Sequence, residues 1–145
     1  MRRTLGKAIA RVHHMQHRYA VPRFKSLGVT RGQPPILMAL EEQDGIPQYE
    51  LAAKVHLRPP TVTRILENME ETGLIRRGPE ESDRRVNRIY LTSEGRKMSQ
   101  SVEDFLANEE REIFSVLTDR EMQTTISVLN KIACRYEEVI EEDRE

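Results

Sequence analysis

The chain has 145 residues, 32% of them charged and 5% aromatic, with one cysteine and a formal net charge of −1. This length is enough for one compact domain with a hydrophobic core, and the composition is typical of a helix-rich protein in contact with water. No apolar run reaches the roughly 20 residues of a membrane span, the first residues do not lead into the apolar core of a signal peptide, and one cysteine excludes an intrachain disulfide, so we expect a cytoplasmic protein that does not enter a membrane.

The small net charge hides an uneven distribution of charge along the chain. Residues 1–53 contain 8 basic and 4 acidic side chains, residues 54–97 contain 10 and 7, and residues 98–145 contain 5 and 13. Phosphate contacts supply most of the sequence-independent affinity of proteins for DNA. The local positive charge of the first 97 residues is therefore compatible with nucleic-acid binding, although the total charge is near zero.

The first predicted helix covers Leu5 to about Phe24, because apolar residues recur there every three or four positions. His13 and His17 lie four residues apart on one face of this helix, a spacing that suits Zn²⁺ or Ni²⁺. A structural metal site needs further ligands, and no cysteine or acidic residue lies near these histidines in the sequence. We therefore expect exposed helix residues or pocket lining, and keep a metal-responsive regulator as an alternative.

The second predicted helix follows a break at residues 27–29. Thr30 and Gln33 have the form of a capping box, which predicts that Thr30 is the N-cap and that Gln33 reaches back to it. The two prolines that follow are compatible with a helix because they lie in its first turn. Residues 44–45 end this helix.

The third and fourth predicted helices form a helix-turn-helix. The third covers residues 48–55, a short turn covers residues 56–58, and the fourth begins at Pro59 and ends near Gly73, which suits a left-handed C-cap. The fourth helix has a stripe of apolar residues expected in the core: Val62, Ile65, Leu66 and Met69. A helix in this position fits the major groove of duplex DNA.

A β-hairpin with arginines at its tip is predicted next. Its strands are residues 74–77 and 84–91, joined by a polar turn. The alternation of the second strand places two apolar side chains on one face and two others on the opposite face: Ile89 with Leu91, and Arg88 with Tyr90. Arg84 and Arg85 alone would suit an ordinary solvated tip, but an arginine on a loop after a recognition helix fits the minor groove. We therefore expect both to contact DNA.

Two long amphipathic helices complete the chain. Residues 92–95 open the first, which has apolar positions as far as Leu117, and residues 118–121 have the form of a second capping box that opens the last helix. Long amphipathic helices at both termini have too little domain to cover their apolar stripes, so we expect them to pair with a second copy of the chain. A two-fold dimer also suits two DNA half-sites about one helical turn apart.

The fold class that follows is mainly α, with about six helices and a two- to three-stranded β-wing in a single domain. Residues 30–95 are the predicted winged helix-turn-helix core, and residues 1–28 and 96–145 the predicted dimerisation helices.

These segments resemble, in order and over nearly the whole chain, the MarR family of bacterial regulators. The matching motifs are Leu27-Gly28-Val29-Thr30 with Gln33, Glu50-Leu51-Ala52, Pro59-Pro60-Thr61-Val62-Thr63-Arg64, Glu70-Glu71-Thr72-Gly73-Leu74-Ile75, Asp83-Arg84-Arg85, and Leu91-Thr92-x-x-Gly95. Met69 stands where this family usually has leucine. A lone helix-turn-helix match would be weak, whereas this ordered set at the family's spacing is specific.

The resemblance implies a homodimeric repressor, or sometimes an activator, that binds a short inverted repeat. Its recognition helices would read the major grooves, its wings would reach the adjacent minor grooves, and a small, often aromatic, anion would release it. The resemblance places Thr61, Thr63 and Arg64 at DNA-facing positions, Arg85 in the minor groove, and Asp83 as the residue that orients the wing. The remaining predicted DNA-binding residues are Pro60, Arg84 and Arg88.

Arg58 is a departure from the family, since many relatives carry serine at this position. Serine would cap the recognition helix better than arginine does, and the loss of a cap costs roughly 1 kcal/mol. Helix N-termini and arginine both attract anions, so we hypothesise that Arg58 contacts a DNA phosphate.

Other functional classes have weaker signals. The sequence has no Gly-rich phosphate loop, no His-Glu-x-x-His motif and no nucleophile elbow, so we expect neither an enzyme nor a bound cofactor or metal. A winged-helix module that binds protein and does not read DNA remains a second alternative. Cys134, in the last helix, is expected to be a packed or interface thiol.

Overall fold

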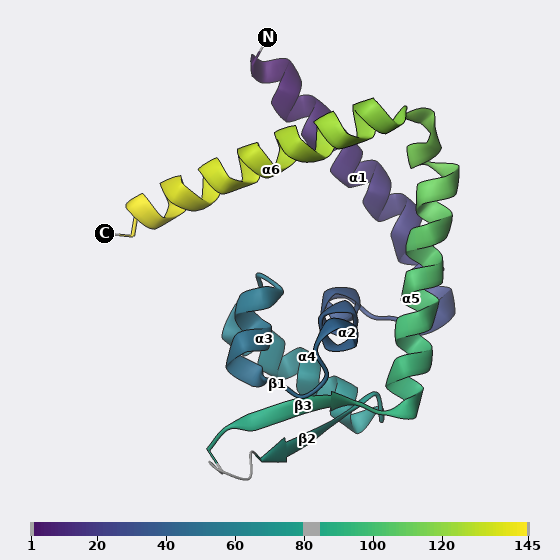
Figure 1. Cartoon of the computed structure of the whole chain (residues 1–145), viewed down its shortest axis with the longest axis vertical. Helices are drawn as coiled ribbons and strands as arrows, with labels where there is room; N and C mark the ends of the chain where they lie inside the picture. The colour runs from purple at the N-terminus through teal and green to yellow at the C-terminus, as the bar shows by residue number, and fades with distance from the viewer. Residues whose placement is uncertain (1, 80–84, 145) are drawn as a thin grey trace. The chain divides into compact units, whose positions relative to one another are not determined.

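The computed structural model describes residues 2–79 and 85–144. In chain order the elements are α1 (Arg2–Leu27), α2 (Gln33–Glu42), β1 (Ile46–Pro47), α3 (Gln48–Lys54), α4 (Pro59–Glu71), β2 (Ile75–Pro79), β3 (Asn87–Leu91), α5 (Ser93–Glu112), the 3-10 helix η1 (Phe114–Val116) and α6 (Asp119–Glu142) (Figure 1). The prediction of a mainly helical chain with a small β-wing is confirmed. The chain forms two compact units, Met1–Phe105 and Leu106–Glu145.

The three strands form an antiparallel sheet in the order β1-β3-β2. In the hairpin, Ile75 pairs with Leu91 and Arg77 with Ile89. The strand β1 lies in a segment read from the sequence as the loop between two helices, and it pairs Ile46 with Ile89. Its second residue, Pro47, is tolerated because β1 is an edge strand.

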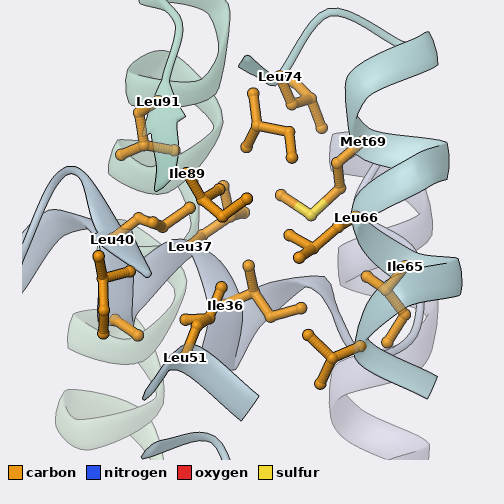
Figure 2. Close-up of a cluster of buried hydrophobic side chains, with 14 of the residues drawn as sticks. Ile36, Leu37, Leu40, Leu51, Ile65, Leu66, Met69, Leu74, Ile89 and Leu91 are labelled. Atoms are coloured by element: carbon orange, nitrogen blue, oxygen red, sulfur yellow. The ribbon is translucent and has the colours of Figure 1, made fainter. Parts of the chain in front are cut away.

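The hydrophobic core of the first unit lies between the helices α2, α3 and α4 and the sheet. Figure 2 shows the side chains of these elements converging on one another. All four residues of the predicted apolar stripe of α4 are buried, with Leu66 and Met69 at 0% exposure. Burial of each such side chain contributes roughly 1.5–3 kcal/mol, so the stripe fixes which face of α4 points away from the core.

The start of α2 differs from the prediction. Gln33 does reach back, since its Oε1 accepts a hydrogen bond from the Thr30 N–H at 3.0 Å. However, Thr30 is not the N-cap: the helix begins at Gln33 and the cap position is Gly32, with φ 86° and no side-chain cap. A left-handed residue at Gly32 breaks the run that a helix from Thr30 would need.

The helix ends follow the local signals elsewhere. Gly73 is left-handed with φ 78°, and the N–H of Leu74 donates to the carbonyl of Met69 at 2.8 Å, which satisfies the end of α4. The predicted capping box of α6 is present: Thr118 Oγ1 accepts from the Glu121 N–H at 3.2 Å, and Glu121 Oε2 accepts from the Thr118 N–H at 2.9 Å.

Two helix lengths were wrong. The helix α1 continues beyond the predicted end, as far as Leu27, and α5 stops at Glu112, before the predicted apolar positions are complete. Within the first unit α1 contacts α5 through aromatic rings, with Phe24 and Phe105 centroids 4.2 Å apart.

Apolar side chains of α1 and α6 remain on the surface. Exposed fractions are 39% for Ile9 and 65% for Val12 in α1, and 46% for Ile126 and 48% for Leu129 in α6. No described helix has both the length and the apolar character needed to cross a membrane.

Candidate nucleic-acid interface

The first two turns of α4 present a surface opposite the buried stripe. Pro60 and Arg64 are exposed, and Thr61 is half-buried. The first turn contains no acidic side chain. A helix N-terminus carries a partial positive charge, which attracts anions. Pro59 and Pro60 have no N–H and the Val62 N–H donates to the Arg58 carbonyl, so Thr61 supplies the backbone donor of this turn.

Arg58 occupies the N-cap position of α4 and is exposed. Its backbone is extended, and no side chain caps the helix. The expectation that arginine does not cap this helix is therefore confirmed. The phosphate contact proposed for it remains a prediction.

Thr63 lies in α4, bonds to a side chain of α3, and is only partly accessible. Its Oγ1 donates to the carbonyl of Pro59 at 3.0 Å and accepts from Gln48 Nε2 at 3.1 Å. A hydroxyl has one proton, so Thr63 already uses its donor inside the fold.

The predicted wing residues fall into three groups. Arg85 is exposed, two residues before β3. Arg88 is partly buried, and its Nη1 donates to the Gly45 carbonyl at 2.8 Å, which ties β3 to the residue before β1. Asp83 and Arg84 lie outside the described residues.

A recess of about 450 Å³ separates the recognition helix from the wing. Its lining comes from α3, α4, β2 and the residues entering β3: Gln48, Tyr49, Ala52, Pro59, Val62, Thr63, Arg77, Arg85, Val86 and Asn87. We call this hollow the wing–helix recess. It brings Thr63 and Arg85 together, whereas Arg58, Pro60, Arg64 and Arg88 are not among its lining residues.

Two polar residues of this recess, Gln48 and Arg77, were missed from the sequence. Arg77 is 19% exposed, and its Nη1 donates to Gln48 Oε1 at 3.2 Å. A signal for Arg77 was present, because strand alternation places it on the same face as the buried Ile75. Gln48 carried no such signal, since its contacts depend on residues 15 and 29 positions away.

The metal alternative has little support in the described chain. His13 and His17 are exposed on α1. Among the described residues, no group of three or more His, Cys, Asp and Glu side chains is placed to hold a metal ion. A structural zinc site needs four ligands, so two histidines do not complete one. Cys134 is exposed on α6 and is thus not packed within the described chain.

Residues 29–86 match the sequence model of the MarR family. A curated relative, the uncharacterized HTH-type transcriptional regulator YybA of Bacillus subtilis (strain 168), is 27% identical over 109 residues, covering 75% of this chain and 73% of that protein. Among solved structures, a MarR transcriptional regulator from Methanosarcina mazei Go1 has 26% identity and a TM-score of 0.77, covering 92% of this chain and 99% of that one. The transcriptional repressor CouR, bound to a 23-mer DNA duplex, has 25% identity and a TM-score of 0.81, with 89% and 92% covered.

Proposed function

This chain belongs to the MarR family of transcriptional regulators, and we propose that it is a homodimeric repressor released from an inverted-repeat operator by a small ligand. Members of this family bind DNA and are not enzymes. The protein-interaction module and the metal sensor are therefore not favoured. We place the protein in the cytoplasm, with the DNA that it would bind.

The observation that carries the proposal is the arrangement around the wing–helix recess. The exposed N-terminal turn of α4 lies on one side of the recess and Arg85 on the other. A helix in the major groove and an arginine in the adjacent minor groove must straddle the phosphate backbone between the two grooves. A recess between them leaves room for that backbone. We propose Arg58, Pro60, Thr61, Arg64 and Arg85 as DNA contacts on this surface.

The dimer is proposed from the exposed apolar stripes of the terminal helices. Leu129 and Ile126 of α6, with Ile9 and Val12 of α1, are 39–65% exposed in the single chain. A second copy would cover this apolar area, which contributes roughly 25 cal/mol per Å² buried. We therefore assign residues 1–28 and 96–145 to dimerisation and residues 30–95 to DNA.

Repression and release would follow from the spacing of the two recognition helices. Half-sites on one face of DNA lie about 34 Å apart, so only a dimer with that spacing engages both. A ligand that binds better to a dimer of another spacing shifts the population away from DNA. The CouR structure, a repressor on a 23-mer duplex, supports an operator of about two helical turns.

Selection of bound duplexes from a random DNA pool at near-physiological salt tests the proposal. We expect an inverted repeat to be enriched, and Arg85→Ala to bind it more weakly than the wild type does. The change Lys131→Ala, which removes an exposed charge from α6, is the matched control and should bind like the wild type. Enrichment of no sequence, with nonspecific, salt-sensitive binding alone, would contradict the proposal.

A further inference from the structure

We propose that Gln48 is a DNA-contacting residue and that Arg77 is the residue that positions it. The inference rests on the proposed DNA-binding function and deepens it. Arg77, Gln48 and Thr63 form one chain of hydrogen bonds from β2 through α3 to α4, with heavy-atom distances of 3.2 and 3.1 Å. We call these three residues the amide relay.

The chemistry of the side chains fixes the direction of the relay. A guanidinium has donors and no acceptor, so the carbonyl oxygen of the Gln48 amide must face Arg77. The Gln48 NH₂ group then faces Thr63, and the Thr63 hydroxyl, having accepted that bond, gives its own proton to the Pro59 carbonyl at 3.0 Å. Arg77 thereby selects one of the two orientations of the amide.

The relay leaves a donor on Gln48 and none on Thr63. Among the described residues, the second hydrogen of Gln48 Nε2 has no acceptor, and Gln48 is half-buried at the edge of the wing–helix recess. In helix-turn-helix proteins the first helix crosses the DNA backbone, and side-chain amides commonly donate to phosphate oxygens. The occupant we assign to this part of the recess is therefore a DNA phosphate, held by the Gln48 amide.

The surroundings of Arg77 argue against a purely structural role. Within the described part of the chain, Arg77 Nε and Nη2 are buried without a hydrogen-bond acceptor, and the nearest carboxylate oxygen, Oε2 of Glu70, is 3.9 Å from Nε. A buried cation with incomplete pairing is a weak contributor to stability. Arg77 lines the recess, but its Nε and Nη2 are buried and its Nη1 donates to Gln48, so the role that we assign to Arg77 is to position the Gln48 amide.

Arg76 is a matched control. It is the neighbouring residue of the same strand, on the opposite face, where its guanidinium lies 4.2 Å from the centroid of the Tyr90 ring. The changes Arg76→Met and Arg77→Met remove the same charge from adjacent positions. Long-range loss of positive charge affects both, whereas loss of the relay affects Arg77→Met alone.

The experiment is a fluorescence anisotropy titration of the duplex selected by the wild type, at several salt concentrations, with Gln48→Ala, Arg77→Met, the double variant and Arg76→Met. We expect Gln48→Ala and Arg77→Met each to weaken binding about tenfold, as for the loss of one hydrogen bond to a charged group. The double variant should be no weaker than Gln48→Ala, because both changes break one relay. The slope of log affinity against log salt for Arg77→Met should match the slope for Arg76→Met.

Additive losses in the double variant would overturn the relay. So would a slope for Arg77→Met that is smaller than that of Arg76→Met by about 0.9, since this would mean direct phosphate contact by Arg77. A loss of the same size in Arg76→Met and Arg77→Met would overturn it too. If the wild type binds the selected duplex specifically and the variants bind it with the same affinity, the relay alone is overturned. If the wild type shows no specific binding, the proposed function is overturned as well.

Gln48→Glu keeps the proposal falsifiable if Arg77→Met fails to fold. The carboxylate has the same shape and accepts from Arg77 more strongly, but it has no proton to donate to Thr63 or to a phosphate. We expect Gln48→Glu to remain folded, as measured by thermal unfolding, and to lose more than tenfold in DNA affinity. Binding equal to that of the wild type would contradict a DNA contact by Gln48.

Discussion

The helices α4 and α6 are both amphipathic, but α4 has a covered apolar stripe and an uncapped N-terminus, whereas α6 has an exposed apolar stripe and a capped N-terminus. In α4 the apolar stripe is covered, with Leu66 at 0% exposure, and the helix N-terminus at Arg58 has no side-chain cap. In α6 the N-terminus is closed by a capping box, and the apolar stripe is uncovered, with Leu129 at 48% exposure. The open part of each helix indicates its partner: an anion for the end of α4, and an apolar surface for the side of α6.

The largest expected effect is on the free energy of unfolding, when a side chain in the buried apolar stripe of α4 is shortened. Leu66→Ala should lower the free energy of unfolding by about 2–5 kcal/mol, because it leaves a cavity among the side chains of Figure 2. Arg64→Ala, on the exposed face of the same helix, should change it by less than about 0.5 kcal/mol. Denaturant unfolding of the two variants measures both values. Similar losses would mean that α4 does not have one buried and one exposed face.

The uncovered stripe of α6 gives the next effect. Leu129→Glu should raise the dimer dissociation constant about a hundredfold or more, roughly 3 kcal/mol, because an unpaired carboxylate would be buried in the interface. Ser127→Glu adds the same charge to the same helix, about half a turn away, and should leave the dimer intact. Sedimentation equilibrium measures the two constants. A dimer unaffected by Leu129→Glu would show that another surface pairs the chains.

Arg58→Ser would give the uncapped N-terminus of α4 a side-chain cap. We expect about 1 kcal/mol of added stability from the new cap, together with weaker DNA binding and a salt slope smaller by about 0.9. Thermal unfolding and anisotropy titrations report the two effects separately. If affinity and slope both stay unchanged, Arg58 does not contact a phosphate.

Thr118→Ala would remove the side-chain cap from the N-terminus of α6. Loss of this cap should destabilise the protein by about 1 kcal/mol. The matched change Thr124→Ala, an exposed threonine within α6, should have a smaller effect, because it caps nothing. Equal effects of the two changes would contradict the contribution of the capping box.

The smallest expected effect is a pH dependence at the same cap. Hydrogen bonds from the Thr118 backbone N–H and hydroxyl lower the pKa of the Glu121 carboxyl below its ordinary value. The folded pKa lies below the unfolded one, so this contribution is fully present above the unfolded pKa and is lost as pH falls through the folded pKa. Unfolding measured from neutral to acidic pH should show a smaller acid loss in Glu121→Gln. An identical pH profile of unfolding in the wild type and in Glu121→Gln would contradict this contribution of Glu121.

The sequence predicted those features that depend on near neighbours. The stripe of α4, the cap of α6 and the left-handed Gly73 all follow from residues within about one or two helical turns. Thr30 shows where this fails: the pattern of a capping box was present, but the conformation of Gly32 moved the start of α2. The strand β1 and the amide relay depend on pairing between distant segments, which periodicity does not report.

The candidate site was predicted in part for the same reason. Arg58 and Arg64 are exposed at the start of α4 as a surface helix end requires. Thr63 and Arg88 were both predicted to contact DNA, but the sequence did not reveal their hydrogen bonds to the Pro59 and Gly45 carbonyls. Such bonds are set by the tertiary packing of α3, α4 and the sheet, and they decide which donors remain for a partner.

The proposed binding of two copies of the chain to one inverted repeat, through α4 and the wing, is open to direct measurement. Its most direct test is the mass of the complex with the selected duplex, measured by sedimentation, together with the affinities of the wild type and Arg85→Ala. We expect two chains per duplex and a loss of about tenfold in affinity for Arg85→Ala. One chain per duplex, or equal affinities at physiological salt, would contradict it.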